Sequence, residues 1–225
     1  MQYDWIRREG SDTVIIFFNG WGMDIHSIST LGNPDVDCCL ISDYTDEVLH
    51  TEDFDRYQHI NLIAWSMGVW AAEFYFPQEI LPKLDQCVAI NGTPYPKHDE
   101  WGIPSIVFNR TLETWDDKVR KKFWLRTVGG KSAAEHLSAT ASKRSTISQQ
   151  EELRFVNDHY NPNYMASLPW SHAFCGEQDL IFPLGNQKTY WQNKAKTMEM
   201  PHFPFLHLQS WSELLIGQHK NETIQ

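Results

Sequence analysis

The sequence predicts an α/β protein with a central, mostly parallel sheet and an inserted helical segment. Short runs of apolar and β-branched residues recur along the chain, and their length is typical of strands buried on both faces. Helix-like segments separate several of these runs, which is the order expected when crossover helices join parallel strands. The alternation stops between about residues 110 and 168 and then resumes.

Six runs are expected to form the sheet, and they are 13–18 (TVIIFF), 36–42 (VDCCLIS), 60–65 (INLIAW), 86–91 (QCVAIN), 172–176 (HAFCG) and 196–200 (KTMEM). Between them, helices are expected over 67–76, where Pro77 would end the helix, and over 184–195.

The segment 110–168 is rich in Lys, Arg, Ser and Gln, and its two strongest patterns, TWDDKVRKKFWLR and ISQQEELRFVNDHY, are helical. We therefore predict a core formed by residues 1–109 and 169–225, with 110–168 as a helical cap over one end of the sheet.

Composition limits the classes of function. The chain has 225 residues, 41% of them hydrophobic, which is enough for one large domain or two small ones. Its formal net charge of −10 disfavours binding to nucleic acid or to an anionic membrane by the molecule as a whole. The start of the chain lacks the apolar region of a signal peptide, and no run is long enough to span a membrane. We expect a monomeric cytoplasmic protein with reduced thiols at its four cysteines, which lack the C-x-x-C spacing of a metal or redox site: Cys38, Cys39, Cys87 and Cys175.

Ser66 lies at the joint between an expected strand and an expected helix, in the sequence A-W-S-M-G. Small residues two positions before and after a serine, here Ala64 and Gly68, are typical of a nucleophile elbow, because larger side chains would collide across the strained turn. The motif alone also fits an ordinary turn, but the flanking strand and helix favour the elbow.

A serine nucleophile needs a base, and His202 is the best candidate of ten histidines. It follows the last expected strand in PHFPF, where the base of an α/β-hydrolase lies. His207 is the alternative, but we expect it at or inside a following helix. The acid should follow the preceding strand, and Asp179 in CGEQDLIFP fits, with Glu177 as its competitor. An alternative role for Asp179 is to cap the loop or helix next to it.

An oxyanion hole needs backbone N–H donors that are already oriented toward the developing charge. The residue after the nucleophile, Met67, would supply one of them. The loop FFNGWG after an early strand would supply the other from Trp21, whose ring would also form a wall of the pocket. The serine, acid and base follow one another in the chain order of an α/β-hydrolase.

These motifs resemble the pimeloyl-[acyl-carrier protein] methyl ester esterases of biotin synthesis, of the BioG type. The resemblance rests on NGWG, YQHINLIAWSMGVWAAE, INGTPYP, GIP, CGEQDLIFP, PHFPF and WSELL, and it covers most of the chain, least clearly 127–165. It implies an α/β-hydrolase fold and the same five site residues: Ser66, Asp179, His202, Trp21 and Met67. The BioH-type esterases, with HGWG and GH-x-P-F, are similar at a greater distance; here Asn19 and Pro201 replace the first His and the Gly.

The resemblance also implies a substrate in which pimeloyl methyl ester is attached to acyl-carrier protein, an acidic partner. The most basic run, DKVRKKFWLR, lies in the expected cap, and a helix there would place Trp115, Val119 and Phe123 on one face. Its cations are expected carrier contacts, with a solvated amphipathic helix as the alternative: Lys118, Arg120, Lys121, Lys122 and Arg126.

Two other functions remain open on the sequence. A broad carboxylesterase for short esters would use the same serine, acid and base, whereas a non-catalytic binding protein would be expected to lack one of them. We expect no cofactor and no metal, because H-E-x-x-H, P-loop and G-x-G-x-x-G motifs do not occur.

Overall fold

The structure, a computed structural model, describes residues 1–45, 48–50, 52–208 and 210–215. It contains one seven-stranded sheet in the order β1-β3-β2-β4-β5-β6-β7. The strands are β1 (Gln2–Arg7), β2 (Thr13–Phe18), β3 (Asp37–Ser42), β4 (His59–Trp65), β5 (Leu84–Ile90), β6 (His172–Gln178) and β7 (Ala195–Pro201). Strands β2 to β7 are parallel, and β1 is antiparallel to β3 at one edge. The predicted α/β class is therefore confirmed.

Helices surround this sheet and also extend beyond it. The α-helices are α1 (Gly68–Tyr75), α2 (Ser105–Thr114), α3 (Asp117–Thr127), α4 (Lys131–His136), α5 (Thr146–His159) and α6 (Leu184–Trp191). Short 3-10 helices are η1 (Ile25–Ile28), η2 (Gln78–Lys83), η3 (Ser138–Thr140), η4 (Gln192–Lys194) and η5 (Trp211–Leu214). In the described part of the chain, no helix has both the length and the apolar character needed to cross a membrane.

The sheet is covered on both faces, as its continuous apolar strands require. In β2, Val14, Ile16 and Phe18 belong to a core shared with α1 and α6. The alternate residues of the same strand, Ile15 and Phe17, belong to a second core. That core is completed by the C-terminal segment, including Phe203, Phe205 and Trp211.

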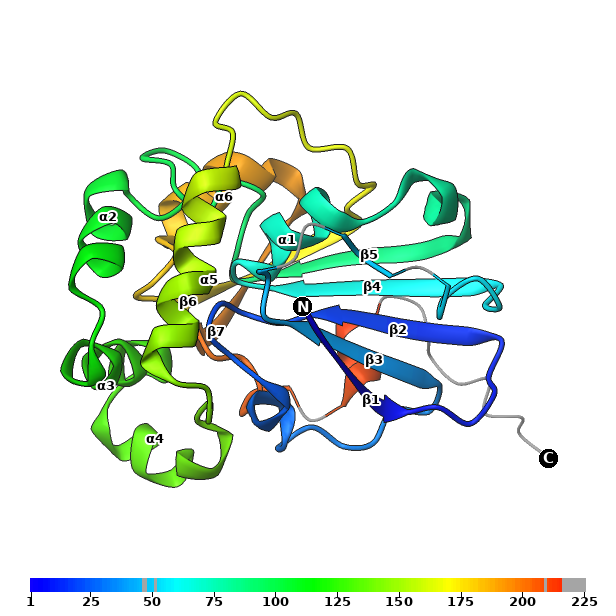
Figure 1. Ribbon diagram of the computed structural model, residues 1–225, viewed down its shortest axis with the longest axis horizontal. Coiled ribbons are helices and arrows are strands. Elements are labelled where there is room, and N and C mark those ends of the chain that lie inside the picture. Colours follow the sequence, from blue (N-terminus) through cyan, green and yellow to red (C-terminus); the bar gives the residue numbers. More distant parts are fainter. Residues whose placement is uncertain (46–47, 51, 209, 216–225) are drawn as a thin grey trace.

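The helices α2 to α5 all lie in the connection between β5 and β6, and Figure 1 shows them grouped at the end of the sheet where the parallel strands finish. We call these four helices and the turns between them the cap. Because the carboxyl ends of parallel strands meet at one edge, the loops after β2, β4, β6 and β7 converge beneath the cap.

Several expectations about elements were wrong. The helix expected over 184–195 ends at Trp191, and Ala195 already belongs to β7. The edge strand β1 was not expected, because it is only partly buried and lacks a continuous apolar run. Strand β6 continues two residues beyond Gly176, to Gln178. The residues around His207 form a turn rather than a helix, and only a short 3-10 helix follows, at Trp211–Leu214.

Candidate active site

Ser66 occupies a strained turn at the end of β4. Its φ of 60° lies in the left-handed region, which residues other than glycine rarely adopt. Its N–H donates to Ile90 O at 2.8 Å. A Cβ on Gly68 would lie 2.3 Å from Phe18 O, and one on Gly92 would lie 2.2 Å from Ser66 O. The turn therefore requires glycine at both positions. Only Gly68 was part of the motif recognised in the sequence.

Ser66, His202 and Asp179 form a hydrogen-bonded chain. The Ser66 Oγ lies 2.9 Å from His202 Nε2, and His202 Nδ1 lies 2.9 Å from Asp179 Oδ2. All three residues are buried: Ser66 is 6% exposed, His202 2% and Asp179 8%. Three residues widely separated in sequence thus have the connectivity that serine activation needs.

The Asp179 carboxylate is fixed by its own loop as well as by the imidazole. Its Oδ1 accepts from the N–H groups of Ile181 at 2.8 Å and Phe182 at 2.9 Å, and its Oδ2 accepts from Gln187 Nε2 at 3.1 Å. Asp179 therefore also caps its loop, which was the alternative role considered from the sequence. The two roles use different oxygens and are compatible.

The His202 backbone is held by residues whose part in the site the sequence did not indicate. Its carbonyl accepts from Trp65 Nε1 and from Asn91 Nδ2, both at 2.9 Å. Asn91 also accepts from Gly176 N–H at 2.6 Å, so one side chain ties the loop after β7 to β6. The only sequence signal was the turn-forming pair Asn-Gly at the end of the strand expected over 86–91, which in the structure ends at Ile90.

The competing candidates do not join this group. His207 is exposed on a turn, with its N–H bonded to Pro204 O at 2.8 Å. Glu177 is exposed within β6, as expected for a residue facing solvent.

Trp21 and Met67, the expected oxyanion donors, line one small cavity together with Ser66 and His202. The carbonyl of Gly20 accepts from Met23 N–H at 3.2 Å. Since peptide N–H and C=O groups point in opposite directions across a trans bond, this contact turns the Trp21 N–H away from Met23. Within the described residues, the N–H groups of Trp21 and Met67 have no protein acceptor. They are therefore free to donate to a reacting oxygen.

Aromatic side chains close the site from the cap side. The Trp21 ring packs against Trp115, with ring centroids 4.5 Å apart, and against Phe123 at 5.2 Å. Val119 packs on the same core, so the predicted apolar face of the basic helix is confirmed for Val119 and Phe123, whereas Trp115 lies before the helix begins. The cavity at Ser66 has a volume of about 10 Å³, room for about one water molecule. A ligand larger than a water molecule would reach this cavity only if the cap or its side chains moved.

The five cations of the basic helix differ in what they contact. Arg120 is half-buried and donates to the carbonyls of Arg144 at 2.9 Å and Ser142 at 3.0 Å. Arg126 donates to Leu180 O, in the loop that follows Asp179. Arg126 is exposed, and so are the remaining three cations, Lys118, Lys121 and Lys122.

The four cysteines are buried and unpaired in disulfides. Burial raises the pKa of the Cys39 and Cys175 thiols to about 12, so they stay protonated. The described residues hold no group of three or more His, Cys, Asp and Glu side chains arranged to bind a metal ion.

Comparison with known proteins places this geometry in context. A family model described as "Pimeloyl-ACP methyl esterase BioG" matches residues 1–214. The crystal structure of BioG from Haemophilus influenzae is similar with a TM-score of 0.86 and 30% identity, covering 95% of this chain and 99% of that one.

Two further relatives are more limited in what they imply. A Bacteroides fragilis protein named malonyl-[acyl-carrier protein] O-methyltransferase is 35% identical over 82% of this chain, but the match spans only 38% of that longer protein. A lipase-esterase related protein from Clostridium acetobutylicum has a TM-score of 0.57 at 17% identity, over 90% of this chain and 92% of that one, which is a likeness of fold.

Proposed function

Because the chain belongs to the BioG family of pimeloyl-ACP methyl esterases and has the α/β-hydrolase fold, we propose that it hydrolyses the methyl ester of pimeloyl-[acyl-carrier protein] methyl ester in biotin synthesis, with Ser66 as nucleophile. The observation that carries this proposal is the hydrogen-bonded chain from Ser66 through His202 to Asp179.

In the proposed mechanism, His202 Nε2 takes the Ser66 proton as Oγ attacks the ester carbonyl. The N–H groups of Trp21 and Met67 stabilise the negative oxygen of the tetrahedral intermediate. His202 then returns the proton to the departing methoxide, which leaves as methanol. Water repeats the sequence on the acyl-enzyme and releases the pimeloyl carboxylate. Asp179 holds the imidazole orientation and stabilises its protonated form throughout.

The acyl chain would lie between the core and the cap. One cavity next to the site is lined mainly by apolar side chains, among them Val107, Phe108 and Leu153. Trp21 and Phe123 line this cavity, the cavity at Ser66 and a third one beside Arg120. Displacement of the Phe123 ring would join these small spaces into a passage. A passage of that kind lets an extended chain reach Ser66 with its far ester, while the thioester at the carrier end stays outside.

The carrier protein would dock on α3. Lys118, Lys121 and Lys122 are exposed on this helix, and an acidic carrier needs positive charge on a protein whose net charge is −10. Arg120 and Arg126, also expected to be carrier contacts, donate to cap and loop carbonyls, so their larger role would be to hold α3 over the site. The Bacteroides relative supports the substrate class, because O-methylation of an acyl-carrier substrate forms the type of bond that this reaction would break.

The test compares hydrolysis of pimeloyl-[acyl-carrier protein] methyl ester with that of methyl butyrate, for the wild type and Ser66→Ala. We expect the wild type to prefer the carrier-linked ester strongly, and the variant to lose kcat on the order of a millionfold. A folded variant that keeps more than a few per cent of activity would exclude Ser66 as nucleophile. Similar kcat/KM values for both esters would instead favour a broad carboxylesterase.

A further inference from the structure

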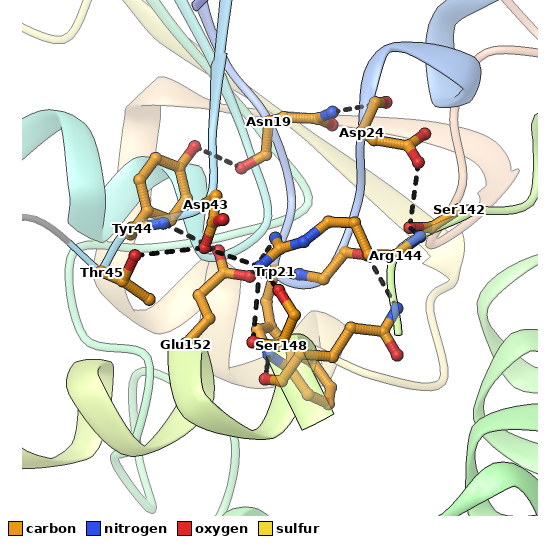
Figure 2. Close-up of polar contacts among 12 residues, drawn as sticks. Asn19, Trp21, Asp24, Asp43, Tyr44, Thr45, Ser142, Arg144, Ser148 and Glu152 are labelled. Carbon is orange, nitrogen blue, oxygen red and sulfur yellow. Dashed lines mark hydrogen bonds and ion pairs between the residues drawn. The ribbon is translucent and has the colours of Figure 1, made fainter. Parts of the chain in front are cut away.

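The carboxylate of Glu152, in the middle of the cap helix α5, is completely buried against two loops of the core. Its Oε2 accepts from Gly22 N–H at 3.0 Å and from Arg144 Nη1 at 2.5 Å, and its Oε1 accepts from Tyr44 N–H at 3.3 Å. Gly22 follows β2 and Tyr44 follows β3, so one cap side chain joins two strand ends to the cap (Figure 2).

Arg144 pairs with this buried carboxylate, and both of its terminal nitrogens are engaged. Its second nitrogen, Nη2, donates to Asp43 Oδ1 at 2.7 Å and to Ser148 Oγ at 2.8 Å. The guanidinium thus lies between carboxylates of the cap and of the core, as Figure 2 shows. Removal of either partner of such a buried pair leaves an uncompensated charge, which is strongly destabilising.

A second cap residue, Gln149, holds the same loop of the core. Its Nε2 donates to Gly22 O at 2.8 Å, and its backbone carbonyl accepts from Trp21 Nε1 at 2.7 Å. The two polar groups of the Gly22 backbone are therefore both bound by α5, with Glu152 on the N–H and Gln149 on the carbonyl. The φ of Gly22 is +70°, and a Cβ there would lie 3.1 Å from the Gln149 side chain.

These contacts act next to the proposed oxyanion donor. Gly22 N–H belongs to the peptide group that links it to Trp21, and the Trp21 N–H belongs to the preceding peptide group. Only the φ and ψ angles of Trp21 lie between the two groups. Met23, the residue after Gly22, also donates to the carbonyl of the preceding group, Gly20 O, at 3.2 Å, which closes the turn around Trp21. The hydrogen bond from Gly22 to Glu152 therefore restricts the direction of the Trp21 N–H.

We propose that Glu152 is a positioning residue for ester hydrolysis: from the cap, it fixes the Gly22 peptide and thereby orients the Trp21 N–H toward the reacting oxygen. This inference rests on the proposed function, in which that N–H stabilises the tetrahedral intermediate. It gives the cap a part in the chemical step, in addition to covering the acyl chain.

Glu152→Gln tests the proposal, because the amide has nearly the same shape but lacks the negative charge and one acceptor oxygen. The matched control is Gln150→Met on the same helix, which removes a hydrogen bond to Leu112 O within the cap. The substrate is methyl butyrate, which needs no carrier protein. The measurements are kcat, KM, the melting temperature and the affinity for a short trifluoromethyl ketone, whose serine adduct carries an oxyanion.

We expect Glu152→Gln to lower kcat by about 10- to 100-fold with KM within about twofold of the wild type, because the loss falls on the transition state. Affinity for the ketone should fall by a similar factor. Gln150→Met should keep kcat within about twofold even where its melting temperature falls. The proposal would be overturned if the Glu152→Gln enzyme kept wild-type kcat and ketone affinity and only its melting temperature fell. Glu152 would then be a purely structural residue.

Glu152→Asp provides a second variant if the glutamine enzyme does not fold. It keeps the charge beside Arg144 and withdraws the oxygens by one methylene, so kcat and ketone affinity should again fall together. Unchanged values in a folded Glu152→Asp enzyme would also reject the positioning role. Loss of the proposed function itself looks different, because the wild-type enzyme would then fail to bind the ketone or Ser66→Ala would remain active.

Discussion

The core and the cap contribute to the site in different ways. In the core, Ser66, Asp179 and His202 lie at the ends of parallel strands, and hydrogen bonds from other core residues hold them. The cap covers the site, with Trp115 and Phe123 packed on Trp21, and it reaches the machinery only from outside, through the hold of Glu152 on Gly22. The difference indicates that Ser66, His202 and Asp179 are held by the core itself, whereas access to Ser66 and, in the proposed function, docking of the carrier protein depend on the cap.

The largest expected effect sharpens this comparison from the core side. Asp179→Asn should lower kcat about 10⁴-fold, because the amide can present its NH₂ to His202 Nδ1 and stabilise the wrong imidazole tautomer. The loss should be the same for pimeloyl-[acyl-carrier protein] methyl ester and for methyl butyrate, measured as kcat for each. A loss confined to the carrier-linked ester would contradict the assignment of the chemistry to the core.

The second prediction concerns the stability of the core in acid. Burial, with a smaller contribution from the nearby Lys196 charge, lowers the pKa of His172 from its ordinary 6.5 to about 4. Between these values the unfolded chain binds a proton that the folded one does not. The free energy of unfolding is therefore highest, as far as His172 is concerned, above pH 6.5. It decreases by about 3 kcal/mol as the pH falls toward 4.

Urea unfolding at pH 7 and at pH 4.5 measures this effect, with His172→Leu as the variant that has no proton to bind. The wild type should lose more unfolding free energy than the variant over this interval. His172 is the first residue of β6, at the end of the sheet opposite to the cap. If its protonation destabilises the whole fold, amide hydrogen exchange at pH 4.5 should rise in β6 and in the cap helix α5 together. Exchange that rises first in α5 would mean that the cap opens independently of the core. An equal pH dependence in both proteins would contradict the assigned role of His172.

Sequence reasoning succeeded where the signal is local. The turn at Ser66 is encoded by a strand, small neighbours and a following helix, all within one short stretch, and the apolar runs gave six of the seven strands. The edge strand β1 was missed because its residues are at most partly buried and form no continuous apolar run, and its pairing with β3 is a long-range contact.

The contacts that hold the site together could not be predicted in the same way. Glu152 and Gly22 are separated by 130 residues, and an isolated glutamate on an amphipathic helix is ordinarily a surface residue. Arg120 and Arg126 were grouped with the lysines by charge alone, and only the folded geometry distinguishes them by their carbonyl acceptors. Asn91 likewise had the signature of a turn and no more.

The smallest expected effect belongs to the surface of the cap. Lys121→Glu with Lys122→Glu should lower kcat/KM for pimeloyl-[acyl-carrier protein] methyl ester by about tenfold at low ionic strength, because the reversed charges repel an acidic carrier during encounter. The effect should shrink as salt is added, since the screening length falls to about 3 Å at 1 M. Methyl butyrate should be hydrolysed at the wild-type rate.

The matched control is Lys194→Glu, just before the amino end of β7. It should leave kcat/KM unchanged for both esters, because this exposed lysine lies at the end of the sheet opposite to the cap. Equal losses on both esters would show that the lysines stabilise the cap, and the division of roles between core and cap would then need a different docking surface.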